Sequence, residues 1–413
     1  MKKMIFLLTG ILLVTSGCSL FQSNSSLMKP PELPVEQQEL KQAIQAFVPA
    51  QAEWLSPNED KTADTIMKTD LDGDGQEELI VFYRLPDETS QMEGIILENK
   101  EGKWTKMSGV KDIGRELMKV EAADLNGDGT KELLIGFSYA AEASDSALVI
   151  YNIEGKKPAK LFESQYSAFF SDDYDEDGRE ELLLSSLIPN QEHTVSLYTF
   201  SKEKPEKVDE LKLDPYVYPY YNSASGYVTP SVKGAIFDST VGAHSSTSFI
   251  VGVKNKKLVE LVPKEMKDKL FRATSANSED KNGDGILEFP ILIEANPDKP
   301  YVDMPFIHEY YQLSDGGKPE FVSRSYQNYP YQYELTIPEE WPEIKIEASD
   351  GRRYVKFLSE EDGSLLFDLY VVDKDKKDSL EGWNVLMESN QFVYVTKSSA
   401  SEFKEYVHVL SSE

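Results

Sequence analysis

The stretch Asp70-Leu-Asp-Gly-Asp-Gly-Gln-Glu-Glu78 recurs in altered form at three later places in the chain. The other copies are Asp124-Leu-Asn-Gly-Asp-Gly-Thr-Lys-Glu132, Asp173-Tyr-Asp-Glu-Asp-Gly-Arg-Glu-Glu181 and Asp280-Lys-Asn-Gly-Asp-Gly-Ile-Leu-Glu288. All of them have an oxygen-bearing side chain at positions 1, 3 and 5, glycine at position 6 and glutamate at position 9. Glycine adopts positive φ without steric cost, so each copy can fold back tightly on itself. The pattern therefore predicts one acidic turn, repeated within a repetitive fold.

The spacing of oxygen atoms in these turns is typical of a calcium site. Calcium takes about six to eight oxygen ligands in a flexible shell, and a tight loop with oxygens at alternate positions can surround one ion. Position 7 varies freely, as expected if that residue contributes only its backbone carbonyl. We therefore expect about four structural calcium ions, one in each loop. The predicted ligands are Asp70, Asp72, Asp74, Gln76 and Glu78; Asp124, Asn126, Asp128, Thr130 and Glu132; Asp173, Asp175, Asp177, Arg179 and Glu181; and Asp280, Asn282, Asp284, Ile286 and Glu288.

The residues that follow each loop distinguish these turns from an EF-hand. An EF-hand needs glutamate at position 12 and a helix on each side, whereas position 12 here is Val81, Ile135, Leu184 or Ile291. Each loop is instead followed by a short apolar run, which is typical of a buried strand. The unit of loop and strand resembles the FG-GAP repeat, also called the integrin-α-like or VCBS repeat. The resemblance implies that each loop joins two strands of one propeller blade and binds its ion at the blade edge.

The spacing of the loops predicts the number of repeats. The loops begin at residues 70, 124, 173 and 280, so the last interval is close to twice the others. A degenerate unit that lacks the acids is therefore expected in residues 234–253. Repeats of about 50 residues with four strands each are what a β-propeller needs. We expect a mainly β fold, with a β-propeller of about five four-stranded blades in residues 36–325.

The segments on either side of the repeats have a different character. Residues 34–47 place apolar side chains at helical spacing and predict a short helix. Residues 327–413 contain several strand-like runs and end in a helical pattern, without an acidic loop. We expect a small C-terminal α+β domain there.

The N-terminus predicts export and lipid anchoring. Residues 1–17 combine a basic start, an apolar stretch and small residues before Cys18, which is typical of a bacterial lipoprotein signal peptide. Cys18 is the only cysteine, so it predicts a lipidated, palmitate-bearing N-terminus and no disulfide. Residues 18–35 are polar and proline-rich, which predicts an extended tether. The expected location is extracytoplasmic, at the cell membrane of a Gram-positive-like bacterium.

Charge and composition limit the possible functions. The formal net charge of −29 excludes nucleic acid as a partner. The four histidines lie far apart without metal-ligand or nucleophile spacing, so no catalytic residue is predicted. The tyrosine-rich stretch 215–227 can offer a stacking surface for a sugar or peptide, although core packing is the commoner explanation. We expect a non-catalytic binding or adhesion module for a surface protein or glycan. The alternatives are an enzyme that acts on polysaccharide or cell-wall polymer and a calcium-regulated envelope accessory protein.

Overall fold

The computed structural model describes residues 35–59, 64–86, 91–139, 146–153, 157–201, 204–242, 245–262 and 266–410. The predicted signal peptide (1–17), the predicted lipidation site Cys18 and all but the last residue of the predicted tether (18–35) lie outside these residues. The chain divides into two units, Met1–Ala52 and Glu53–Glu413. In the described part of the chain, no helix has the length and apolar character needed to cross a membrane.

The described part of the first unit contains one helix, α2 (Val35–Gln45). Ile44 is buried, and its carbonyl accepts hydrogen bonds from the amides of Phe47 and Val48 in the turn that ends the helix. The helix expected over residues 34–47 is therefore confirmed, with its end two residues earlier.

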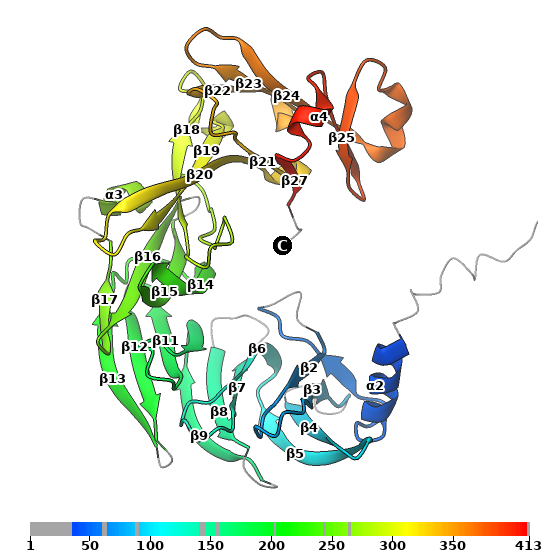
Figure 1. Ribbon diagram of the computed structural model, residues 1–413, viewed down its shortest axis with the longest axis vertical. Helices are drawn as coiled ribbons and strands as arrows, with labels where there is room; N and C mark the ends of the chain where they lie inside the picture. Colours follow the sequence, from blue (N-terminus) through cyan, green and yellow to red (C-terminus); the bar gives the residue numbers. More distant parts are fainter. Residues whose placement is uncertain are drawn as a thin grey trace, which may run out of the picture. The chain divides into compact units, whose positions relative to one another are not determined.

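The second unit is built mainly from antiparallel β-sheets (Figure 1). The described residues contain six sheets of four or five strands. The first three comprise β1 (Glu53–Leu55), β2 (Ile66–Thr69), β3 (Glu78–Arg84), β4 (Met92–Lys100) and β5 (Lys103–Ile113); β6 (Glu116–Ala123), β7 (Glu132–Ser138), β8 (Ser146–Asn152) and β9 (Ala159–Gln165); and β10 (Ala168–Asp172), β11 (Glu181–Ile188), β12 (Glu192–Phe200) and β13 (Pro205–Lys212). The mainly β class expected from the sequence is confirmed, as are sheets of about four strands.

The remaining three sheets follow in chain order, with two strands contributed from the C-terminal end. They comprise β14 (Tyr220–Thr229), β15 (Val232–Val241), β16 (Ser245–Lys254) and β17 (Lys257–Glu260); β18 (Phe289–Glu294), β19 (Phe306–Leu313), β20 (Pro319–Asn328), β21 (Tyr333–Thr336) and β27 (Val407–Val409); and β22 (Ile344–Ala348), β23 (Tyr354–Ser359), β24 (Leu365–Asp373), β25 (Asn384–Glu388) and β26 (Phe392–Thr396). Short helical segments occur at α3 (Lys267–Leu270), η4 (Tyr301–Asp303), η5 (Tyr329–Tyr331), η6 (Asp350–Arg352), η7 (Lys374–Ser379) and α4 (Ala400–Phe403).

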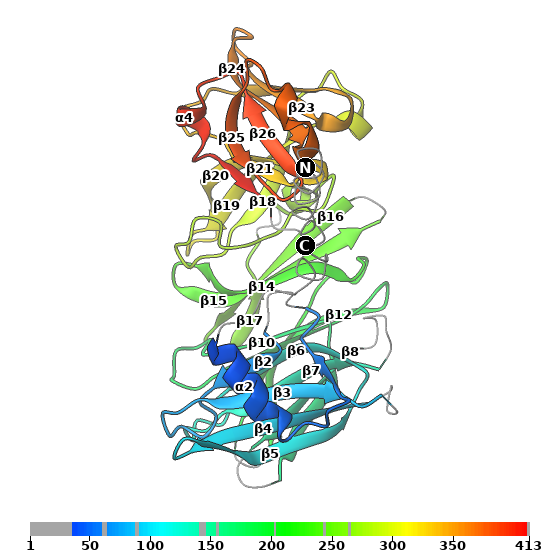
Figure 2. The same cartoon turned by 90° about the vertical axis from the view of Figure 1, so that its right-hand side faces the viewer.

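Neighbouring sheets of the second unit share apolar cores. One core combines Ile80 and Phe82 of β3 with Leu133 and Ile135 of β7, and similar cores join each later pair of sheets. Figure 2 shows β3, β4 and β5 side by side in the first sheet. Strands such as β3 and β7 are buried on both faces, which explains why they are continuously apolar and do not alternate. Complete burial of a leucine such as Leu133 contributes about 1.5–3 kcal/mol.

The fourth sheet contains the residues in which a degenerate unit is expected. Strands β15 and β16 form the expected strand, turn and strand in residues 234–253. The position that corresponds to the acidic loops is the connection between β14 and β15, because each earlier loop joins the first two main strands of its sheet. That connection is only a tight turn at Pro230 and Ser231, with Thr229 paired with Val232.

The C-terminal region contributes to two sheets. Strand β21 extends the fifth sheet and pairs with β27, in the register Tyr333 with Val409, while β22–β26 form the sixth sheet. The expected boundary at residues 325–327 falls within β20. The helical pattern expected at the end of residues 327–413 is corrected to the four residues of α4 followed by β27. Val407 is buried in this pairing, so tertiary packing favours a strand over the helical pattern.

Candidate metal centres

All four acidic loops have the same register between two antiparallel segments, which are strands for the first three loops and an isolated bridge for the fourth. In each loop the residue before position 1 pairs with the closing glutamate. The pairs are Thr69 with Glu78, Ala123 with Glu132, Asp172 with Glu181 and Glu279 with Glu288. The expected arrangement of a loop followed by a strand is therefore confirmed for β3, β7, β11 and β18.

The aspartate at position 1 organises each turn by accepting backbone hydrogen bonds. In the first loop the amides of Gly73 and Gly75 donate to Asp70 at 2.8 and 3.0 Å. The bond from the position-6 glycine recurs at 2.9 Å in the other loops, from Gly129 to Asp124, Gly178 to Asp173 and Gly285 to Asp280. The four position-6 glycines have φ between 86° and 89°, a region that disfavours other residues. The glycine requirement inferred from the sequence is therefore met.

The glutamate at position 9 joins the end of each loop to its beginning. All four closing glutamates are buried, and each accepts a hydrogen bond from the backbone amide at position 2. These bonds run from Leu71 to Glu78 (2.7 Å), Leu125 to Glu132 (3.1 Å), Tyr174 to Glu181 (3.0 Å) and Lys281 to Glu288 (2.6 Å). The start of the loop is thus tied to the start of the following strand.

Burial raises the pKa of every closing glutamate, because the charged carboxylate loses solvation. Aspartates of the same loop raise the pKa further by repulsion. The pKa reaches about 7 for Glu132, Glu181 and Glu288, and is also raised for Glu78. A nearby cation would favour the charged form of these groups and so remove the electrostatic cost.

Carboxylates of three loops lie close enough to share one ion. In each of these loops, one ligand atom from each carboxylate lies within 4.8 Å of the others. The groups are Asp70, Asp72 and Glu78; Asp173, Asp175 and Glu181; and Asp280, Asp284 and Glu288. At position 5, Asp74, Asp128, Asp177 and Asp284 accept hydrogen bonds from the position-7 amides. Metal binding by the carbonyls of Gln76, Thr130, Arg179 and Ile286 stays a prediction.

The second loop is closed by amides. Glu132 accepts hydrogen bonds from Nδ2 of Asn126 at 2.7 Å and from Nδ2 of Asn152 at 3.1 Å. Asn152 lies at the end of β8 and was missed by sequence analysis, because it is far from the loop in the chain. Oδ1 of Asn126 is buried without a hydrogen-bond partner among the described residues. The second loop therefore holds its closing glutamate with neutral donors.

The third loop contains an internal cation. Nζ of Lys256, from the turn between β16 and β17, lies 2.9 Å from Oδ2 of Asp175 and 3.1 Å from Oδ2 of Asp177. Arg179, at position 7 of the loop, adds a 2.9 Å ion pair with Asp177. Hydrogen bonds from Arg179 and then Lys256 lower the pKa of Asp177 to about 2. Sequence analysis missed Lys256 because it belongs to the neighbouring sheet.

The fourth loop fits a cation best by its hydrogen bonding. Glu288 is 0% exposed, and its Oε1 has no hydrogen-bond partner in the described part of the chain. An unpaired buried carboxylate oxygen is costly, so an oxygen of this kind beside Asp280 and Asp284 fits a bound cation. Carboxylate and carbonyl oxygens suit hard cations such as calcium, magnesium and manganese. The donor set of this loop therefore fits the predicted ion.

Neighbouring loops also contact one another. The amide of Lys131 in the second loop donates to the carbonyl of Leu71 in the first at 2.7 Å. A Cβ atom at Gly73 would lie 2.4 Å from the carbonyl oxygen of Gly129, so only glycine permits this approach. Arg179 of the third loop packs similarly against Gly127 of the second. The first three loops, which lie in three different sheets, are therefore neighbours in the structure.

The tyrosine-rich stretch 215–227 divides between surface and interior. Tyr216 and Tyr218 are exposed, whereas the hydroxyl of Tyr220 lies 2.6 Å from Nε2 of the buried His193. Tyr221 donates to the carbonyl of Ala276. The structure therefore places part of this stretch in the core and part at the surface.

A scan against models of protein families finds no match, and a search of curated proteins also finds none. Three of the solved structures that match this chain have TM-scores of 0.35 to 0.36. The Saccharomyces cerevisiae protein Sqt1 has a TM-score of 0.36 and 10% identity, covering 81% of this chain and 83% of that one. A hypothetical selenium-binding protein from Sulfolobus tokodaii has a TM-score of 0.36 and 11% identity, covering 81% and 76%. A Bacillus licheniformis rhamnogalacturonan lyase has a TM-score of 0.35 and 12% identity, covering 76% and 71%. These likenesses are too distant to assign a family.

Proposed function

We propose that this chain is a lipid-anchored, extracytoplasmic calcium-binding protein that acts as a non-catalytic binding module for a protein or glycan at the cell surface. Its sheets would be blades of a β-propeller of FG-GAP type, with calcium as a structural ligand. One observation supports this proposal above all others. Four loops from separate parts of the chain have the same register, and each of them has its own buried closing glutamate.

The shared geometry favours a bound cation because each loop gathers several carboxylates, and no positively charged side chain is found at the same place in all four loops of the described chain. Among the described residues, only the third loop has a lysine paired with its predicted ligand carboxylates, and only the second loop has a closing glutamate that accepts from side-chain amides. In the first loop Asp70, Asp72 and Glu78 converge, and in the fourth loop Glu288 keeps an unpaired oxygen. We therefore expect the first and fourth loops to bind calcium most tightly.

The ion would stabilise the fold by joining two adjacent strands. In the first three loops the residues that would hold it include position 1, just after one strand, and position 9, at the start of the next. In the fourth loop position 1 follows the bridge residue Glu279, and position 9 comes just before β18. Calcium supplies positive charge and about six to eight coordination positions when bound. Extracellular calcium modules have dissociation constants on the order of 10⁻⁴ to 10⁻³ M, so such loops would be filled outside the cell. The sites would then serve stability and not sensing.

Calorimetric titration of the full-length chain in mild detergent tests this proposal. We expect calcium binding in that affinity range and a higher melting temperature with calcium than with chelator. Asp280→Asn with Asp284→Asn should remove one site. The control is Glu339→Gln with Glu340→Gln, which also removes two charges but from an exposed segment outside the loops. A chain that binds no calcium, or a control variant that loses as much binding as the loop variant, would contradict the proposal.

A further inference from the structure

A polar pocket lies beside the fourth loop, formed by residues that were not predicted as metal ligands. Its cavity volume is about 440 Å³, within the range of about 300–1,000 Å³ that is usual for small-molecule sites. The lining residues that matter here are Glu279, Lys281, Gln327, Tyr329, Gln332 and Glu334. They come from the fourth loop region, from β20, from the η5 turn and from β21.

Lys281 lines this pocket and connects it to the fourth loop. It occupies position 2 of the fourth loop, where the other loops have the buried residues Leu71, Leu125 and Tyr174. Its Nζ lies 2.9 Å from Oε2 of Glu334 and 3.1 Å from Oε1 of Glu279. The fourth loop therefore differs from its relatives by directing a lysine toward two carboxylates in the pocket.

Gln327 links Glu334 to Tyr329 by hydrogen bonds. Its Nε2 donates to Oε1 of Glu334 at 3.1 Å, and its Oε1 accepts a 2.6 Å hydrogen bond from the hydroxyl of Tyr329. The hydroxyl of Tyr329 is thus held in place while 51% of the residue stays exposed. Gln332 lines the same pocket from a left-handed backbone position, with φ of 52°. The pocket therefore combines planar polar groups with the half-exposed, oriented ring of Tyr329.

We propose that this pocket binds a neutral carbohydrate. Amide and carboxylate groups offer paired donors and acceptors that suit adjacent sugar hydroxyls. The ring of Tyr329 offers a rigid apolar face against which a sugar ring can stack. Two carboxylates neutralise Lys281, and the chain has a net charge of −29, so an anionic ligand is disfavoured. This inference rests on the proposed function and specifies its glycan alternative.

The same lysine couples the pocket to the fourth loop. The backbone amide of Lys281 donates to the closing Glu288 at 2.6 Å, while the side chain of Lys281 lines the pocket and pairs with Glu334. An ion that orders Glu288 therefore also orders Lys281. Carbohydrate is expected to bind more tightly in calcium than in chelator.

The test is saturation-transfer difference NMR on the full-length chain in mild detergent, with maltose and N,N′-diacetylchitobiose as neutral probes and glucuronate as an anionic probe. Tyr329→Ala removes the ring, and Gln332→Gly removes a side chain where glycine suits the backbone. Tyr218→Ala is the matched control, because Tyr218 is 50% exposed and lies outside the pocket. We expect transfer to at least one neutral probe, at least tenfold weaker binding in the two pocket variants, and unchanged binding in the control.

Three results would overturn the inference: no transfer to either neutral probe, transfer to glucuronate alone, or Tyr329→Ala binding as well as the unmodified chain. Calorimetric calcium titration of each variant separates this result from the proposed function. Calcium binding that persists without carbohydrate binding overturns the pocket alone. Carbohydrate binding that persists in a chain unable to bind calcium supports the pocket and overturns the calcium proposal.

Discussion

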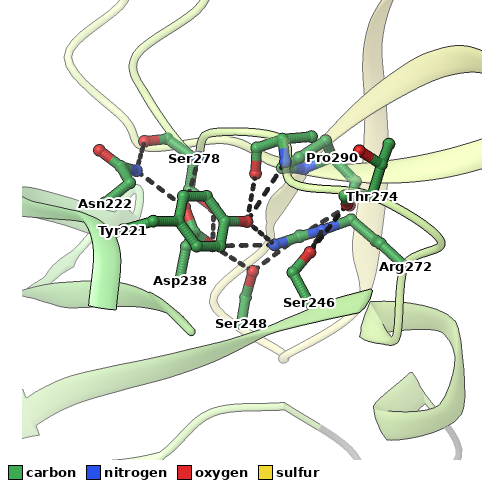
Figure 3. Close-up of polar contacts among 10 residues, drawn as sticks. Tyr221, Asn222, Asp238, Ser246, Ser248, Arg272, Thr274, Ser278 and Pro290 are labelled. Carbon is green, nitrogen blue, oxygen red and sulfur yellow. Dashed lines mark hydrogen bonds and ion pairs between the residues drawn. The ribbon is translucent and has the colours of Figure 1, made fainter. Parts of the chain in front are cut away.

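Arg272 and Asp238 form a completely buried ion pair, with Nη2 of the arginine 3.2 Å from Oδ1 of the aspartate (Figure 3). Arg272 also donates to Ser248 and to the backbone carbonyl of Pro290. Asp238 accepts a 2.7 Å bond from the amide of Ser278. The pair therefore ties β15 and β16 of the fourth sheet to the segment that leads into the fourth acidic loop and to β18.

Replacement of Arg272 should be strongly destabilising. Arg272→Met leaves Asp238 buried without its cation, and breaking a buried ion pair on one side costs about 3–5 kcal/mol. The free energy of unfolding, measured by urea denaturation, should fall by about 3–5 kcal/mol. The matched control is Arg353→Met, which breaks a partly exposed pair with Asp373 and should cost about 1 kcal/mol or less. Equal losses in the two variants would show that burial of the pair is unimportant.

The sequence predicted the parts of the site that depend on local spacing. Positive φ at Gly75 follows from the nine residues of one loop, and strand β3 follows from the apolar run after it. Lys256 and Asn152 could not be predicted, because each reaches a loop only after strands far apart in the chain have paired. Strand β27, where the sequence pattern predicts a helix, could not be predicted for the same reason. It pairs with β21, which lies about 70 residues earlier in the chain.

Removal of Lys256 should strengthen calcium binding at the third loop. Its ammonium lies between Asp175 and Asp177, where it would compete with an incoming cation. For Lys256→Met we expect about tenfold tighter calcium binding at one site, together with a lower melting temperature in chelator. Calorimetry and thermal melting measure the two effects. Lys257→Met, which breaks the exposed pair with Asp209, should leave the calcium affinities unchanged; a similar gain in that variant would mean that only net charge matters.

A carboxylate at position 3 of the second loop should have opposite effects with and without calcium. Asn126→Asp removes a donor to the buried Glu132 and adds a like charge beside it. In chelator the free energy of unfolding should fall by about 1–3 kcal/mol, because the buried carboxylate loses a partner. In saturating calcium the variant should recover, and its second loop should bind the ion more tightly. A loss of stability that calcium does not reverse would argue against a metal site in this loop.

His308 should contribute stability that is lost in mild acid. It is buried in β19, and desolvation lowers its pKa to about 4, with smaller contributions in the same direction from Arg272 and Lys281 and an opposing one from Glu334. In the unfolded chain a histidine binds its proton near pH 6.5. The stability from this group is therefore complete above about pH 6.5 and is lost as the pH falls toward 4.

Between pH 7 and pH 5 the unmodified protein should lose about 2 kcal/mol of unfolding free energy through this histidine. His308→Phe keeps an aromatic ring of similar size and removes the titrating group, so its loss over the same interval should be smaller by that amount. Urea unfolding at both pH values, in chelator so that metal binding does not contribute, measures the difference. Identical pH dependence in the two proteins would show that the buried imidazole takes up its proton without unfolding.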